Sequence, residues 1–283
     1  MKIGCHVSIR SGYTGAAKAA LQAGANAFQY FPKNPRNLSV KAFDRSDAAA
    51  CKQFCAAHGL VSIAHTPYPT NLAVDDPEVY EMTVRSVLND LEIVDACGSI
   101  GLVVHFGQYK GMTAGPLYGY QVMIRMLNDI LSQWTGASML LIENNAGQGN
   151  PMGTTLEELA QVRQLLAHPE KVGYCFDTCH AFASGMWHGH DWPDVAARAR
   201  ELAYFQHVKA IHLNDSQYPS ASRRDRHANI GRGDIPAEGF MQFFATPEVQ
   251  GLPLILETPN GPDGTHQEEI SLVKNHFLSF SGK

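Results

Sequence analysis

Eight short apolar stretches recur along the whole chain, most of them followed by a longer segment with helical periodicity, and this rhythm constrains the fold most. Several of the stretches are continuously apolar, such as "GLVVH", "MLLIE" and "LILE". Unbroken apolar runs of this kind are typical of parallel strands that are covered on both faces. We therefore predict strands at residues 2–7, 26–31, 61–65, 101–105, 138–143, 172–177, 207–213 and 253–257.

Helical patterns lie between these predicted strands. The clearest cover residues 14–23, 77–97 and 155–166, and in the last of these Thr154 or Thr155 precedes "LEEL", which is typical of a capped helix start. No linker divides the chain. Eight strand–helix units in 283 residues predict an α/β fold, a (β/α)8 TIM barrel that forms a single domain over residues 1–283. A doubly wound sheet is the structural alternative.

Functional residues of such a barrel belong at the carboxyl ends of the strands. Six successive predicted strands carry an imidazole or a carboxylate there: His65, His105, Glu143, Asp177, His212 and Glu257. One polar residue at a strand end commonly means only that the chain has reached water, whereas six would converge on one mouth, where like charges would repel one another unless cations bind. Histidine and carboxylate ligands suit zinc, manganese or iron, and Glu143 could bridge two metals. The sequence therefore predicts a metal site at the carboxyl face of the barrel.

The stretch "CFDTCHAFASG", residues 175–185, adds an imidazole, His180, to the carboxylate at the sixth strand end. We expect Asp177 and His180 to belong to the ring of ligands and Cys179 to stay outside it. Asp215 follows His212, on the seventh predicted strand, by three residues.

A second motif, "SRRDRHANIGRGDI", fills residues 222–235 after the seventh strand. Asp225 and His227 stand two apart, so an extended segment would point both to the same side. Four arginines accompany them and suit phosphate contacts, while Gly231 and Gly233 would let the backbone approach a ligand. The alternative is a solvated basic loop. Further cations fall in predicted strand–helix loops: Arg10, Lys33, Arg36 and Lys110.

The composition limits which partners and which cellular location the sequence predicts. The net charge of −5 argues weakly against a nucleic-acid partner unless bound metals and clustered arginines make one face basic. No apolar run suggests a signal peptide or a membrane span. Six cysteines, with no short secreted pattern, predict reduced thiols and a cytoplasmic location, with Cys51 and Cys55 in the core.

With these features in place, the sequence resembles the endonuclease IV family of apurinic/apyrimidinic endonucleases, the AP endonuclease 2 branch of xylose-isomerase-like barrels. The matching stretches span almost the whole chain in the family's order: "GCHVS", "KNPR", "HTPYPTNL", "VVHFG", "IENNAGQG", "FDTCHAFASG", "HLNDS", "RRDRHANIGRGDI" and "PLILETPN". The combination of "ENNAGQG", "DTCHAFA" and "DRH" with its following glycines is specific to this family.

The resemblance implies three zinc ions per chain, which Mn²⁺ or Fe²⁺ could replace, held by nine residues. The first would take His65, His105 and Glu143; the second Glu143, Asp177, His212 and Glu257; the third His180, Asp225 and His227. Glu143 would be the bridging ligand beside a hydroxide that attacks phosphorus in line. The implied reaction is hydrolysis of the phosphodiester 5′ to an abasic site, leaving a 3′-hydroxyl and a 5′-deoxyribose phosphate, with 3′-end phosphodiesterase activity as a possible addition.

The resemblance also implies the partner, which is double-stranded DNA with abasic sites or blocked 3′ ends, bound by a monomer with no membrane association. Arg36, Asn37 and Tyr68 fall where the family contacts the minor groove. The family's common "KNxRQW" reads "KNPRNL" here, so Asn37 and Leu38 depart from it, and "HFG" stands where "HPG" is common.

Two rival functions remain open. A metal-dependent sugar isomerase or epimerase on the same barrel would need one or two metals and no third group. The residues that distinguish an endonuclease from such an enzyme are therefore His180, Asp225 and His227. A non-catalytic DNA-binding protein would not need an activated water, and the full ligand set argues against it.

Overall fold

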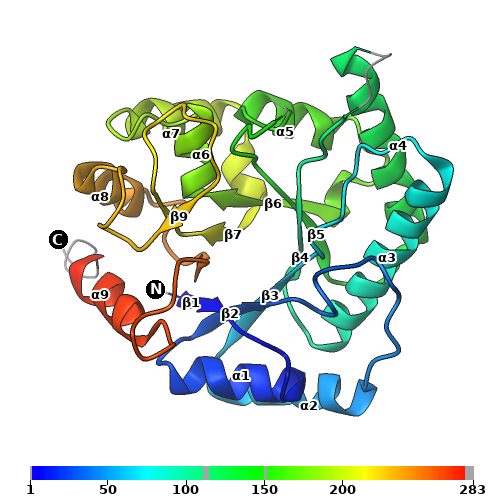
Figure 1. Ribbon diagram of the computed structural model, residues 1–283, viewed down its shortest axis with the longest axis horizontal. Helices are drawn as coiled ribbons and strands as arrows, with labels where there is room; N and C mark the ends of the chain where they lie inside the picture. Colours follow the sequence, from blue (N-terminus) through cyan, green and yellow to red (C-terminus); the bar gives the residue numbers. More distant parts are fainter. Residues whose placement is uncertain (1, 111–114, 150–151, 278–283) are drawn as a thin grey trace.

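Eight parallel strands close into a barrel in the computed structural model, which describes residues 2–110, 115–149 and 152–277 (Figure 1). The strands are β1 (Lys2–His6), β2 (Ala27–Tyr30), β3 (Val61–His65), β4 (Gly101–His105), β5 (Met139–Glu143), β6 (Val172–Asp177), β7 (Val208–His212) and β10 (Pro253–Leu256). Strand β1 pairs in parallel with both β2 and β10, so the sheet has no edge. The predicted barrel is confirmed, each strand end lies within one residue of its prediction, and the doubly wound alternative is wrong.

Helices surround the barrel on its outside (Figure 1). They are α1 (Gly12–Gln22), α2 (Arg45–His58), α3 (Pro77–Ala96), α4 (Pro116–Gln133), α5 (Leu156–Gln164), α6 (Thr178–Ser184), α7 (Trp192–Glu201), α8 (Ala237–Ala245) and α9 (Gln267–Phe277), with short 3₁₀ turns at Pro169–Lys171 and Tyr204–His207. Helix α5 begins with a capping box in which Thr155 and Glu158 satisfy each other's backbone N–H. Thr155, rather than Thr154, is therefore the cap.

Two apolar layers position the strands. Inside the barrel a small cluster contains one residue from each strand except β1: Ala27, Ile63, Val103, Leu141, Cys175, Ala210 and Ile255. The larger layer lies between the strands and the helices and contains Cys51 and Cys55, both buried free thiols. Because side chains fill the barrel interior, a ligand can approach only at the mouths.

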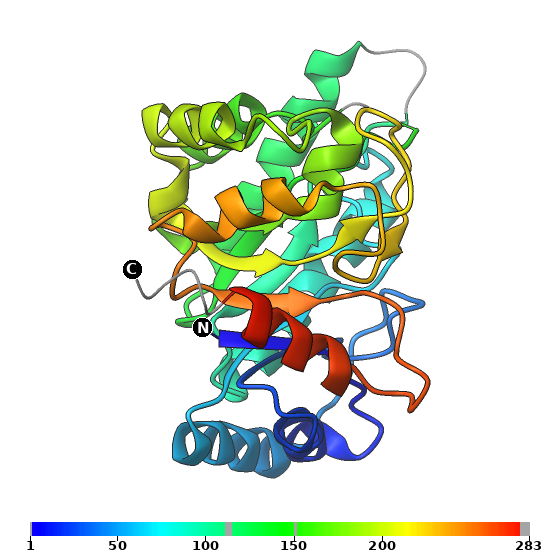
Figure 2. The same cartoon turned by 90° about the vertical axis from the view of Figure 1, so that its left-hand side faces the viewer.

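One mouth carries the polar residues. Figure 2 shows β7 and β10 running toward the side of the molecule where β8 (Asp215–Ser216) and β9 (His227–Ala228) lie. His65, His105, Glu143, Asp177 and His212 are the last residues of their strands, and Glu257 follows the last residue of β10. In the described part of the chain, no helix has the length and hydropathy to cross a membrane.

Candidate metal centre

Glu143 lies at the centre of the polar mouth and is fully buried. Its Oε2 is 3.3 Å from His65 Nε2 and 3.4 Å from His105 Nε2, while its Oε1 is 2.9 Å from His212 Nδ1 and 3.3 Å from His180 Nδ1. Strands β3, β4 and β7 and helix α6 therefore each place one imidazole against a single carboxylate.

The imidazoles and carboxylates of the mouth form three groups whose candidate ligand atoms lie within 4.8 Å of one another. The groups are His65, His105 and Glu143; then Glu143, Asp177, His212 and Glu257; and then His180, Asp225 and His227. Ligand atoms about 2.0 Å from a tetrahedral zinc lie about 3.3 Å apart. The separations around Glu143 have this size, so the donor set fits cations of the zinc type.

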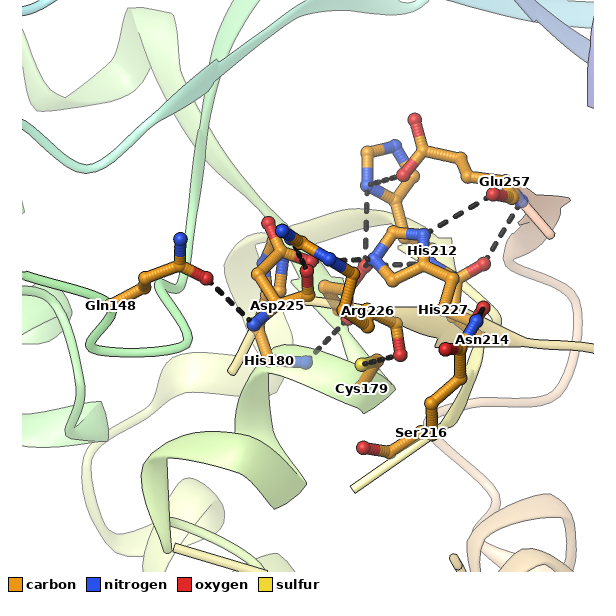
Figure 3. Close-up of polar contacts among 12 residues, drawn as sticks. Gln148, Cys179, His180, His212, Asn214, Ser216, Asp225, Arg226, His227 and Glu257 are labelled. Carbon is orange, nitrogen blue, oxygen red and sulfur yellow. Dashed lines mark hydrogen bonds and ion pairs between the residues drawn. The ribbon is translucent and has the colours of Figure 1, made fainter. Parts of the chain in front are cut away.

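The third group gives a more specific indication of a cation. Asp225 Oδ1 lies 3.2 Å from both His180 Nε2 and His227 Nε2. Figure 3 shows these three residues at the mouth. Both nitrogens are buried, yet neither makes a hydrogen bond with proper geometry. Buried polar atoms are normally satisfied, and two imidazole nitrogens directed at one carboxylate oxygen would be satisfied by a shared cation.

The second ring nitrogen of several histidines is already fixed. Nδ1 contacts a backbone carbonyl at 2.8 Å in His65 (Thr66 O), 2.9 Å in His180 (Asn144 O) and 3.2 Å in His227 (Glu257 O). Because a carbonyl can only accept, Nδ1 donates in each case. Nε2 of the neutral ring is then left with its lone pair toward the carboxylates, which is the arrangement that metal-binding histidines adopt.

Two buried asparagines hold the carboxylates. Asn144 Oδ1 accepts from the Asp177 N–H at 2.8 Å, and Asn214 donates to Asp177 Oδ2 at 2.7 Å while accepting from the Glu257 N–H at 2.9 Å. Asp177 Oδ1 in turn accepts from the His180 N–H at 2.7 Å and so caps α6. The local sequence Asp-Thr-Cys-His thus ends a strand and starts a helix, which turns both side chains to the mouth.

Electrostatics also favour cations here. Burial alone would raise the pKa of Glu143, but the His212 and His105 rings hold that pKa well below its ordinary value. Burial likewise opposes protonation of His227, but Asp225 beside the ring raises the pKa of His227 to about 9. The buried carboxylates therefore need positive partners, and metal ions binding to these rings would replace their protons.

Cys179 lies within the same spacing of Asp177 and His227. Burial, with the charge of Asp177, raises the pKa of the Cys179 thiol to about 12, and its S–H donates to Arg226 O at 3.7 Å. A protonated thiol is a poor metal ligand. The exclusion of Cys179 from the ligand set stays a prediction that this environment favours.

Asp215 organises the loop that carries the third group. It is fully buried, and its carboxylate accepts from four backbone N–H groups: Ser216 at 2.7 Å and Gly231, Gly233 and Ile235 at 3.0 Å each. A Cβ at Gly233 would lie 2.3 Å from Ser216 O. The close backbone approach predicted for Gly231 and Gly233 is thus made to Asp215, because these amides surround its carboxylate.

Strands β8 and β9 connect this carboxylate to the candidate ligands. They pair antiparallel, with Asp215 opposite Ala228 and Ser216 opposite His227. The loop after β7 is therefore folded back on itself around Asp215, and the position of His227 depends on that fold.

A cavity of about 1280 Å³ opens above the three groups. This cavity is lined by Arg36, Asn37 and Tyr68, the three residues for which the sequence predicts DNA contacts. They lie in the loops after β2 and β3. The Tyr68 side chain is 70% exposed, its ring lies edge-on to Phe31 at 5.1 Å, and its N–H donates to Pro35 O at 2.9 Å. The two loops are thereby joined, and an aromatic ring stands free at the rim.

Lys33 was predicted to be one of the loop cations at the mouth, but its charged group is buried. Its Nζ is buried, donates to Ser86 O and Oγ at 2.8 Å each, and lies 3.1 Å from Asp90 Oδ1 in helix α3. The buried acid draws the cation inward, so Lys33 anchors its loop and presents no charge to a ligand. The other end of the loop is anchored in the same way, since Asn89 exchanges two hydrogen bonds with the Lys41 backbone, at 2.8 and 3.1 Å.

Gln29 and His6, like Asn144 and Asn214, lie at the mouth and were not predicted as functional. Gln29 is fully buried on β2, and His6 ends β1 beside the cavity. The signals were present, because "AFQYF" holds one polar residue in an apolar strand and His6 occupies the same kind of strand end as His65.

Comparisons with known proteins agree with the geometry of the site. A family model described as a xylose isomerase-like TIM barrel matches residues 17–276. A protein named probable endonuclease 4 from Symbiobacterium thermophilum is 42% identical over 275 residues, which cover 97% of this chain and 99% of that protein.

Solved structures are similar as well. The crystal structure of endonuclease IV from Thermus thermophilus superposes with a TM-score of 0.85 at 32% identity and covers 99% of both chains. A D-tagatose 3-epimerase-like protein reaches a TM-score of 0.74 at 16% identity, over 99% of this chain and 98% of that one, a likeness of fold alone.

Proposed function

The chain belongs to the endonuclease IV family, and from that membership we propose that it is a metal-dependent DNA repair endonuclease that hydrolyses the phosphodiester 5′ to abasic sites. The products would be a 3′-hydroxyl and a 5′-deoxyribose phosphate, and blocked 3′ ends would be further substrates. The observation that carries the proposal is the third group, in which the Nε2 atoms of His180 and His227 converge on Asp225 and neither makes a hydrogen bond with proper geometry.

We propose three zinc ions per chain, which Mn²⁺ or Fe²⁺ can replace, with Glu143 shared between the first two groups. Bound there, the metals would supply an activated water and neutralise charge on the scissile phosphate. The chain's own contribution is a rigid set of ligands, since Glu143, Asp177 and His212 are fully buried at the ends of barrel strands. Such burial fixes the positions of ligand atoms before the substrate arrives.

The cavity and its rim would hold the DNA. Tyr68, exposed and supported by Phe31, would stack on a base or fill the space that a missing base leaves. Arg36 and Asn37 are exposed on the neighbouring loop. A missing base lowers the cost of unstacking the damaged nucleotide, which the buried ligands need in order to reach its phosphate.

Charge on this face supports the same substrate. Arg10, Arg36, Arg223, Arg224 and Arg226 are exposed in the loops beyond the carboxyl ends of the strands, and Arg224 lies over the Tyr218 ring at 4.6 Å. An acidic chain can thus present a basic surface to phosphates. We propose that the protein acts on double-stranded DNA as a monomer, as one domain, in the cytoplasm.

A duplex with one tetrahydrofuran abasic analogue tests the proposal. We expect incision 5′ to the analogue that leaves a 3′-hydroxyl, and loss of this activity with a strong chelator. Glu143→Gln should reduce incision by several orders of magnitude because it disrupts the shared ligand, whereas the matched change Glu170→Gln, at an exposed carboxylate, should not. Incision that resists the chelator, or near wild-type incision by Glu143→Gln, would refute this function.

A further inference from the structure

Gln29 connects three residues of the mouth through one amide. It is fully buried on β2, and its Cα is in register with that of His6 on β1. Nε2 lies 2.6 Å from Glu257 Oε1 and 3.2 Å from His6 Nδ1, and Oε1 lies 2.7 Å from His212 Nε2. Strands β1, β2 and β7 and the end of β10 thus meet at this side chain.

The orientation of the amide follows from Glu257. An ionised carboxylate can only accept hydrogen bonds, so the group that faces Glu257 is the NH₂ of Gln29 and the carbonyl faces His212. His212 must then donate from Nε2. In the neutral ring, Nδ1 keeps its lone pair, and it lies 2.9 Å from Glu143 Oε1 and 3.2 Å from Glu257 Oε2. The nitrogen that faces the second ligand group is therefore Nδ1.

The second hydrogen of the same NH₂ points at His6. Because Gln29 donates to His6 Nδ1, the neutral His6 ring must carry its proton on Nε2. His6 lines the cavity, with its ring against Phe31 at a centroid distance of 4.5 Å. The Nε2–H of His6 is therefore not bonded to the Gln29 amide, and His6 itself lines the cavity.

We propose that Gln29 sets the tautomers of two histidines at once, holding His212 with Nδ1 free for a metal and His6 with an Nε2–H donor for a phosphate oxygen of the DNA. Gln29 is then a positioning residue and His6 a further substrate-binding residue. The identity of the metal and of the phosphate rests on the proposed function. The hydrogen-bond chain from His212 through Gln29 to His6 does not.

Two substitutions separate the parts of this chain. Gln29→Leu removes both the donor and the acceptor at similar size. Gln29→Glu keeps an acceptor for His212 Nε2–H but removes the donor to His6 Nδ1 and places a second carboxylate against Glu257. We therefore expect Gln29→Leu to release both rings, and Gln29→Glu to release His6 while leaving the His212 tautomer in place.

Long-range ¹H–¹⁵N spectra of protein labelled at histidine read the tautomers directly, with signals assigned by their loss in His6→Asn and His212→Asn. In the zinc-loaded wild type at pH 7, both rings should be protonated at Nε2 and not at Nδ1. In Gln29→Leu, His6 should show a mixed tautomer, and chelator competition should show one zinc bound roughly 10- to 100-fold more weakly while the other two are unchanged. Ser62→Ala, on the neighbouring strand β3, removes a buried contact to Ser99 and should change neither readout.

Protonation of either ring at Nδ1 in the zinc-loaded wild type would overturn the inference. Unchanged spectra and unchanged zinc affinity in Gln29→Leu would overturn it too. Failure of the protein to incise abasic DNA, with the expected tautomers observed, would instead remove the proposed function and leave the role of Gln29 in place.

Discussion

Replacing Asp215 with Asn should detach the third ligand group while leaving the other two. Asp215 accepts from four backbone N–H groups, two on each carboxylate oxygen. Asparagine offers one acceptor oxygen and turns its NH₂ toward the other two donors. In either orientation two backbone donors lose their acceptor and face another donor.

The free-energy cost of Asp215→Asn follows from the two backbone donors that lose their acceptor. A buried donor left without a partner costs about 1–3 kcal/mol, so two cost about 2–6 kcal/mol. At about 1.4 kcal/mol per factor of ten, this corresponds to roughly 30-fold to 10⁴-fold in an equilibrium constant. Exposed Gly231 can turn to water, which favours the lower end. Because β9 carries His227 and pairs with β8 at Asp215, we expect the third metal to bind roughly 30-fold more weakly.

Zinc titration against a chromophoric chelator measures this. Asp215→Asn should show two tight sites and one weak site, and limited proteolysis should cut residues 217–235 faster than in the wild type. Asp234→Asn is the matched control, since it makes the same chemical change at an exposed position of the same loop. Three tight sites in Asp215→Asn would refute the argument that this carboxylate holds the group together.

Further expectations concern the metals, the DNA and the dependence of stability on pH. Asp225→Ala or His227→Ala should lower the zinc content by one per chain while sparing the other two, and unchanged stoichiometry by elemental analysis would remove the third site. Arg36→Ala should raise the dissociation constant for abasic duplex more than for intact duplex, because only the damaged duplex is readily distorted; equal weakening would reduce Arg36 to a phosphate contact, and no weakening would return it to a solvated cation. Burial raises the pKa of Asp90 from 3.8 to about 7, so the folded state binds more protons than the unfolded state in that window and stability falls as the pH rises through it. Urea unfolding should therefore show the wild type losing stability relative to Asp90→Asn between pH 5 and pH 8, and a constant difference would contradict this.

The fold was predictable because its signals are local. Short, mostly apolar runs predicted the strand ends to within one residue, and eight of them in alternation with helices leave few topologies. The convergence of the strand-end residues followed from the barrel itself, since parallel strands bring their carboxyl ends to one mouth. Their role as metal ligands stays a prediction that this convergence supports.

Contacts between distant segments were not predictable in the same way. Lys33 reads as a loop cation until Asp90, far along the chain, is packed beneath it. Gln29 acquires its meaning only when β10 closes the barrel and brings Glu257 within 2.6 Å of its amide. In both cases the partner is chosen by tertiary packing, and nothing in the neighbouring sequence names it.

The anchoring of the loop after β2 has a consequence for how such proteins diversify. Helix α3 holds both ends of the loop, through Asp90 at Lys33 and Asn89 at the Lys41 backbone, and neither anchor uses the exposed side chains of Arg36 and Asn37. The residues at the tip of this loop can therefore be substituted while the two anchors, the barrel and the ligand groups stay unchanged. Lesion preference could drift, or be re-engineered, one tip residue at a time.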